Sequence, residues 1–177
     1  PESEFHPGGS GGATAVEDQG PLRVRLKTTA LSNLWQATWY FYDDHISMTV
    51  EQIDHPYWFL YEGTPGGLVE PNSDFVTRSD GTQTLLSRSW NENIVGEGWV
   101  YFSDPGFARS LFVASHTGDS ETDFYTTLND EMTVFGFGRT GTTPLIDTAP
   151  RTFSVGLIDS IDFDVSARKI RSIVLDL

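Results

Sequence analysis

Side chains alternate between two faces, with a period of two, along residues 35–42 (WQATWYFY). One face carries Trp35, Ala37, Trp39 and Phe41, and the other carries polar residues and two tyrosines. This period is that of a half-buried β-strand, because successive side chains of a strand point to opposite sides of the sheet. The segment therefore restricts the fold to one that contains a sheet with one apolar and one more polar face.

A second alternating segment follows at residues 45–50, after only two aspartates. Two residues are the usual length of a tight hairpin turn, so the two segments are predicted to pair as antiparallel strands. The pairing places Tyr42 opposite His45 and Tyr40 opposite Ser47. Tyr40, Tyr42 and His45 would then form a row of rings with polar groups, which is either a sugar-binding surface or a set of side chains covered by a loop.

Eight further segments have the composition of strands and are separated by turn residues. They are residues 22–31, 57–63, 73–78, 83–90, 98–103, 109–116, 131–138 and 152–159. Two stretches, 57–61 and 110–114, are apolar on both faces, which is typical of central strands covered on both sides. Many short strands with little helical periodicity predict an all-β fold, an antiparallel β-sandwich or jelly roll.

The C-terminal residues break this pattern. Apolar residues recur there at helical spacing, at Ile170, Ile173, Val174 and Leu177. The spacing predicts one short C-terminal helix, with a final strand as the alternative because the same stretch is also β-prone.

Residues 1–20 are rich in glycine and have almost no apolar periodicity, which is the composition of a flexible linker. The segment is predicted to be an inter-domain tether, a remnant of cloning, or an arm that docks on another subunit. Residues 21–177 are then predicted to form a single β-sandwich domain of ordinary size. We expect this domain to be one module of a larger protein or assembly.

The charge balance argues against several classes of partner. Eleven Lys+Arg against 25 Asp+Glu give a formal net charge of −14, whereas nucleic acids and anionic membranes are bound mainly by cationic side chains. No apolar run approaches the roughly 20 residues that cross a bilayer. Because the chain has no cysteine, disulfides and thiolate metal sites are excluded as well. We expect an acidic, extracellular or cell-surface protein that binds neither nucleic acid nor membrane.

The densest group of aromatic residues lies in residues 55–67, where HPYWFLYEG runs into a turn rich in glycine and proline. Trp58 and Tyr61 are predicted to be platforms for sugar rings, with Glu62 accepting hydrogen bonds from hydroxyl groups. A core strand packed between two layers is the alternative. The carboxylate of Glu62 then lies either at the sheet edge in water or near the core, where burial would raise its pKa.

Catalytic candidates are few in this sequence. A glycoside hydrolase needs two carboxylates, and the glutamates with the most strand-like neighbours are Glu62, Glu97 and Glu131. A polysaccharide lyase needs a proton-abstracting tyrosine or histidine and a cation that neutralises a uronate. The residues that would supply these groups are His116, Tyr125 and Arg139.

Arg139 ends a stretch in which glycines alternate with phenylalanines. Glycine in a strand allows a ring, a backbone or a ligand to approach closely. Arg139 is expected on the same face as Phe135 and Phe137, where it either forms a structural salt bridge or binds a ligand carboxylate.

Carboxylates alternate in the segment GDSETD at Asp119, Glu121 and Asp123. Oxygen ligands of this kind suit a hard cation such as Ca²⁺. Neither this segment nor the acidic stretch at residues 159–164 matches the EF-hand pattern. A structural calcium site is therefore one interpretation, and a solvated acidic loop is the other.

In layout, residues 22–160 resemble the concanavalin A-like and related β-sandwiches. That resemblance implies glycan binding, glycan hydrolysis or polysaccharide cleavage by elimination. Together with the aromatic platforms, it predicts a module that recognises a carbohydrate polymer. A glycan-cleaving enzyme, either lyase or hydrolase, is one alternative, and a structural subunit that docks through its N-terminal arm is the other.

Overall fold

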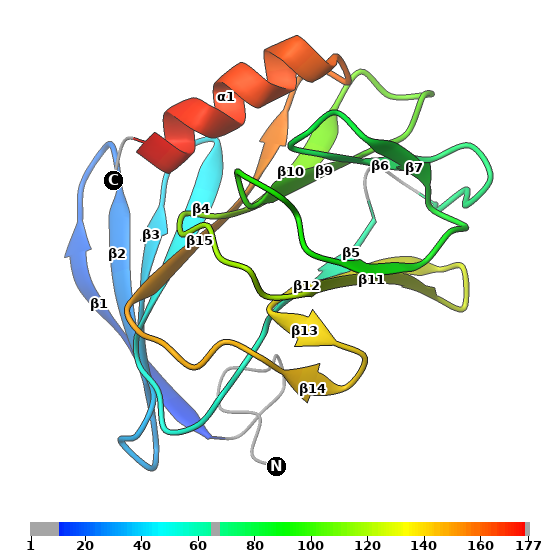
Figure 1. Ribbon diagram of the computed structural model, residues 1–177. Coiled ribbons are helices and arrows are strands. Elements are labelled where there is room, and N and C mark those ends of the chain that lie inside the picture. Colours follow the sequence, from blue (N-terminus) through cyan, green and yellow to red (C-terminus); the bar gives the residue numbers. More distant parts are fainter. Residues whose placement is uncertain (1–10, 65–67, 176–177) are drawn as a thin grey trace.

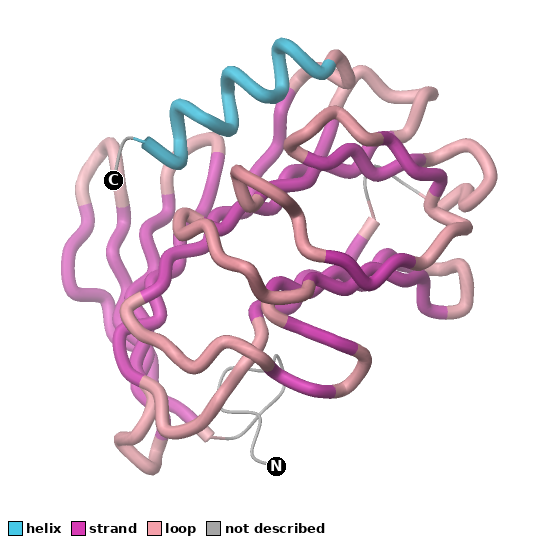
Figure 2. Tube along the Cα trace, viewed as in Figure 1, coloured by secondary structure: helices cyan, strands magenta, loops and turns pink. Residues whose placement is uncertain are grey.

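Two antiparallel sheets and one helix form the layers of the computed structural model, which describes residues 11–64 and 68–175 (Figures 1 and 2). The nine-stranded sheet has the spatial order β1 (Gly12–Gln19), β2 (Val24–Ala30), β3 (Gln36–Phe41), β4 (His45–Gln52), β15 (Arg151–Ile158), β10 (Ser110–Ser115), β9 (Trp99–Ser103), β6 (Phe75–Arg78) and β7 (Gln83–Leu85). The four-stranded sheet has the order β5 (Phe59–Gly63), β12 (Met132–Phe137), β11 (Asp123–Leu128) and β8 (Trp90–Glu92). A short ribbon of β13 (Arg139–Thr140) and β14 (Thr143–Pro144) and the helix α1 (Phe163–Leu175) complete the fold. This architecture confirms the predicted all-β sandwich with one C-terminal helix.

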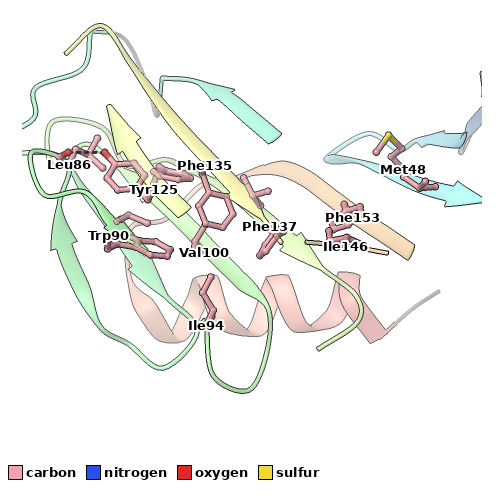
Figure 3. Packing of buried hydrophobic residues seen from close by; sticks show 14 of the residues in the cluster. Met48, Leu86, Trp90, Ile94, Val100, Tyr125, Phe135, Phe137, Ile146 and Phe153 are labelled. Carbon is pink, nitrogen blue, oxygen red and sulfur yellow. Dashed lines mark hydrogen bonds between the residues drawn. The ribbon is translucent and has the colours of Figure 1, made fainter. Parts of the chain in front are cut away.

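The main core lies between the two sheets. Strand pairing turns Tyr125 and Phe135 of the smaller sheet toward Phe102 of the larger one, and all three are fully buried. The ring centroid of Phe102 lies 5.9 Å from that of Tyr125 and 6.2 Å from that of Phe135. Figure 3 shows Trp90 beside Tyr125 and Phe135. With no cysteine in the chain, packing of aromatic rings takes the place that a disulfide has in many small sandwiches.

Helix α1 covers the opposite face of the nine-stranded sheet (Figure 1). Asp162 begins it, because its carboxylate accepts a hydrogen bond from the backbone N–H of Val165 at 3.0 Å. The apolar stripe of the helix and the sheet together form a second cluster of buried residues. The helix contributes Ala167, Ile170 and Ile173, and the strands contribute Trp99, Tyr101, Phe112, Ala114 and Ile158. The spacing of apolar residues therefore predicted the helix correctly.

The predicted hairpin is also confirmed. Tyr40 pairs with Ser47 across β3 and β4, and the backbone N–H of Tyr42 donates to the carbonyl of His45 at 2.9 Å to close the two-residue turn. The rings of Tyr42 and His45 stack with centroids 4.4 Å apart.

The segment predicted as a flexible linker differs in part. Residues 12–19 form β1, which pairs with β2 in an antiparallel register from Gly12 opposite Ala30 to Gln19 opposite Val24. Every residue of β1 is exposed, so backbone hydrogen bonding to the edge of β2, rather than burial of side chains, holds this strand. Residues 1–10 of the predicted linker lie outside the described residues.

Two other strand predictions need correction. Residues 57–61 were expected in a central strand, but β5 is the edge of the four-stranded sheet and begins at Phe59. Residues 83–90 divide into β7 and β8, which belong to different sheets. The chain turns between them at Arg88, whose N–H donates to the carbonyl of Leu85.

No helix in residues 11–64 and 68–175 is long and apolar enough to cross a membrane.

Candidate functional site

The outer face of the four-stranded sheet brings together three of the predicted site residues. Leu60 pairs with Gly136, and Gly136 pairs with Phe124, so these positions share the face that points away from the core. Glu62 lies on the same face two residues after Leu60. We call the surface formed by Trp58, Leu60, Glu62, Phe124 and Arg139 the Arg139 face.

The guanidinium of Arg139 lies between two aromatic rings. Its Cζ atom is 4.9 Å from the ring centre of Trp58 and 5.0 Å from that of Phe124, distances at which cation–π attraction is favourable. The side chain crosses Gly136, where a Cβ atom would stand 2.9 Å from Arg139 Cδ. Gly136 is therefore the residue that leaves room for the arginine.

A turn at Gly138 places Arg139 on this face. Gly138 has φ +61°, a conformation that favours glycine, and it reverses the chain between β12 and β13. Phe135 and Phe137 point into the core. The prediction that Arg139 shares their face is therefore wrong, because a strand period cannot be extended through a residue with positive φ.

Among residues 11–64 and 68–175, Arg139 has no strong ionic partner. Burial lowers the pKa of Arg139, and the charge of Glu62 opposes this effect. In the described part of the chain, no carboxylate oxygen is within salt-bridge distance of the guanidinium, and its Nη1 atom is buried without a hydrogen-bond partner. Nε donates to the carbonyl of Gly141 at 2.6 Å. The face thus presents a cation and the exposed carboxylate of Glu62 beside aromatic rings.

Two other predicted site residues belong to the core. Tyr61 points toward the larger sheet, its ring centroid is 6.1 Å from that of Phe102, and burial raises the pKa of Tyr61 to about 12. Tyr125 is fully buried and donates its hydroxyl hydrogen to the carbonyl of Leu86 at 2.9 Å (Figure 3). Burial also raises the pKa of Tyr125, so neither hydroxyl is placed as a surface ligand or a ready base.

His116 lies on the helix side of the nine-stranded sheet. Its Nε2 atom shares a hydrogen bond with Ser154 Oγ at 2.7 Å, and burial lowers the pKa of His116 while a hydrogen bond to the backbone of Val174 opposes this. His116, Tyr125 and Arg139 therefore occupy three different layers. The structure does not bring the predicted lyase set together.

A cavity of about 200 Å³ opens beside His116, between the end of α1 and the start of β9. Its polar walls are already partnered: Glu97 accepts hydrogen bonds from Trp99 Nε1 at 2.9 Å and from Arg171 Nε at 2.7 Å. Glu97 is thus a structural partner of α1 in this arrangement, and it is remote from Glu62.

The hairpin surface of Tyr40, Tyr42 and His45 faces the helix side as well. His45 Nδ1 bonds Asp44 Oδ1 at 2.6 Å, and Asp44 is also ion-paired with Lys169 of α1. Tyr42 and His45 therefore stack on each other, and His45 also contacts Asp44, which pairs with the helix. Tyr40 is half-buried.

Predicted calcium ligands face Arg151. Its Nη1 atom is ion-paired with Asp119, and its Nη2 atom is 3.6 Å from Glu121 Oε1. We call Asp119, Glu121, Asp123 and Arg151 the Arg151 cluster. Within the described ranges, no three His, Asp or Glu side chains converge closely enough to hold a metal ion. The geometry does not favour the predicted calcium site, because a guanidinium already neutralises two of its carboxylates.

Asp123 is the most perturbed member of the Arg151 cluster. It is 5% exposed, and it accepts hydrogen bonds from the backbone N–H groups of Gly138 at 3.0 Å and Ile94 at 3.3 Å. Burial raises the pKa of Asp123 to about 7; the two N–H donors oppose the shift, and the charges of Asp119 and Glu121 add to it.

We expect stability to depend on pH through Asp123. The folded protein keeps this proton up to about pH 7, whereas an unfolded aspartate releases it near pH 3.9. The free energy of unfolding therefore falls as pH rises from about 4 to about 7. Urea denaturation across this range should show a flatter profile for Asp123→Asn, while Asp159→Asn, at an exposed residue, should keep the wild-type slope. Equal slopes for Asp123→Asn and wild type would refute this assignment.

The comparisons with known proteins concern the fold. No known protein family and no curated protein matches this sequence. Its structure is similar to the solved structure "Crystal Structure Analysis of HI1317", with a TM-score of 0.55 and 11% identity over 82% of this chain and 65% of that one. The likeness is one of fold alone. The match spans less than two thirds of the length of that chain.

Sequence reasoning missed Phe124, which completes the Arg139 face. It belongs to β11, a strand that was not predicted. The alternation in DFYTTL was the available signal, but the preceding acidic residues favoured a loop.

Proposed function

We propose that this chain is a carbohydrate-recognising module of an extracellular or cell-surface protein, and that sugar binds on the Arg139 face. One observation carries the proposal: the guanidinium of Arg139 stands between Trp58 and Phe124, beside the exposed carboxylate of Glu62. Sugars offer C–H faces that pack on aromatic rings and hydroxyl groups that bond charged donors and acceptors. This face supplies both kinds of contact.

Neighbouring polar groups extend the same surface. Asn91 pairs with Phe124 and so lies on the outer face, where its side-chain amide donates to Thr140 Oγ1 at 2.9 Å. Amides and hydroxyls of this kind commonly bond sugar hydroxyls. A strand-based platform also holds its groups rigidly, which lowers the entropic cost of binding.

Binding is favoured over bond cleavage. The proximity of Glu62 to Arg139 suits an enzyme as well as a binder, but the predicted base residues His116 and Tyr125 lie in other layers. A catalytic assignment needs an acid and a base within reach of the same bond. Glu62 is the sole predicted catalytic carboxylate on this face.

We expect Trp58→Ala to weaken retention in affinity gels that contain neutral or uronic polysaccharides. Loss of one ring contact corresponds to roughly tenfold in affinity, or about 1.4 kcal/mol. The melting temperature should change little, because Trp58 lies outside the core cluster. Tyr61→Ala should instead lower the melting temperature, since its ring packs in the core.

Tyr40→Ala is the matched control on the other side of the nine-stranded sheet. It should retain wild-type binding. If Tyr40→Ala loses retention while Trp58→Ala keeps it, the Arg139 face is not the site. Incubation with the same polysaccharides tests for cleavage. New reducing ends would identify the protein as a hydrolase instead of a binding module, and absorbance from unsaturated ends would identify it as a lyase.

A further inference from the structure

Two buried carboxylates face each other at one end of the sandwich. Asp74 precedes β6 and Asp104 follows β9, and the ladder between these strands ends at the pair of Phe75 and Ser103. Asp74 and Asp104 continue that ladder as the next opposed positions, on the same side as the buried pair one step further in. Their carboxylates are therefore near neighbours in the inner layer.

In the described part of the chain, this pair lacks a neutralising cation. Asp74 is 0% exposed and Asp104 is 7% exposed. Of the two carboxylate oxygens of Asp74, Oδ1 is buried and has no hydrogen-bond partner. Among the residues that the structure describes, no ion pair reaches either carboxylate. A buried carboxylate is costly unless a cation, a proton or hydrogen-bond donors satisfy it.

Electrostatic effects agree with this geometry. Burial raises the pKa of Asp74, and the charges of Asp104 and Glu70 add to the effect. Tyr125 is the other titratable neighbour, since the charge of Asp74 raises its pKa in turn. Within residues 11–64 and 68–175, this pair of carboxylates has no arginine or lysine partner, unlike the Arg151 cluster, where a guanidinium supplies the positive charge.

We propose that Asp74 and Asp104 bind one divalent cation of the calcium class at the junction of β6 and β9. Both carboxylates already accept a backbone N–H, from Glu70 to Asp74 Oδ2 at 2.7 Å and from Gly106 to Asp104 Oδ1 at 2.6 Å. The bond from Glu70 opposes the effect of burial on the pKa of Asp74, and each bond leaves the other oxygen of its carboxylate for a metal. A cation is therefore favoured over a proton shared between the two carboxyls.

The rest of the coordination shell does not need further buried acids. Ca²⁺ accepts six to eight oxygen ligands, and these can include backbone carbonyls and water. Two buried carboxylates, completed by backbone carbonyls and water, give a hard, all-oxygen ligand set, which selects calcium or magnesium over zinc or copper.

Titration calorimetry of the wild-type chain with CaCl₂ after treatment with EDTA tests the proposal. One calcium per chain is expected, and calcium should raise the melting temperature by several degrees. Asp74→Asn and Asp104→Asn should each abolish the heat and the shift. Asp130→Asn, in an exposed turn where asparagine also accepts the positive φ of 57°, should keep both.

Other results overturn the proposal. If calorimetry of the wild-type chain shows no heat of calcium binding, the proposed cation site is refuted. This result does not depend on the folding of any variant. If Asp74→Asn is then more stable than wild type at pH 8, the pair shares a proton instead. Calcium binding that survives in both folded variants places the ion elsewhere.

Discussion

Replacing Arg151 by methionine should destabilise the fold more than the loss of any other cation. The Arg151 side chain is 8% exposed and lies against Asp119 and Glu121. Its removal leaves two carboxylates, 22% and 21% exposed, without a counter-charge; for fully buried pairs such a change costs about 3–5 kcal/mol, and we expect a loss that approaches this range. Urea denaturation at pH 8 measures this loss as a lower free energy of unfolding.

The destabilisation caused by Arg151→Met should be smaller at low pH. Burial raises the pKa of Glu121, with Asp119 adding to the effect and Arg151 opposing it. Without the arginine, Glu121 and Asp123 take up protons more readily in the folded state, so the variant regains stability as pH falls toward 5. Adding Glu121→Gln to Arg151→Met should recover part of the stability at pH 8.

Arg109→Met is the matched control. Arg109 pairs with Asp159 at 2.6 Å, but the two side chains are 55% and 78% exposed. Exposed pairs contribute roughly 0–1 kcal/mol. Equal effects of the two methionine variants at pH 8 would show that the Arg151 cluster is solvated, contrary to its burial.

Phe135→Ala should have an effect of similar size through packing alone. Phe135 is fully buried, and its ring centroid lies 4.7 Å from that of Phe137 and 5.8 Å from that of Trp90. Removal of a buried phenylalanine ring costs about 3–5 kcal/mol, because the cavity that it leaves collapses only in part. For a chain of this size, this corresponds to a fall in melting temperature of roughly 6–20 °C.

Phe107→Ala provides the comparison, since Phe107 is 53% exposed. Its melting temperature should stay close to that of the wild type, and Phe135→Leu should lie between the two alanine variants. A small effect of Phe135→Ala would mean that the two sheets tolerate a void at their centre. Calorimetry measures all three variants in the same buffer.

Local periodicity predicted most of the strands because each depends on neighbours in sequence. The β3–β4 hairpin is the clearest case, with Tyr40 opposite Ser47 as its spacing required. Helix α1 followed from apolar spacing after Asp162. Strand β1 was not predictable in the same way, because its side chains are exposed and its stability comes from backbone bonds to β2.

The candidate site was harder to predict because it depends on which face each residue occupies. Trp58 and Glu62 lie on the Arg139 face, but Tyr61, between them in sequence, points into the core. The positive φ of Gly138 moved Arg139 to the opposite face from the one expected. Sequence spacing also gave no sign that Arg151 would meet Asp119, 32 residues away.

Strand β15 is the last strand in the chain, yet it lies near the middle of the larger sheet, between β4 and β10. Thr152 reaches Thr49 across 103 residues to form a hydrogen bond of 2.9 Å. Closing so long a loop costs conformational entropy, and this cost slows the pairing of β15 with β4. Because β15 alone joins β4 to β10, we expect the larger sheet to close only after residues 151–158 have been synthesised.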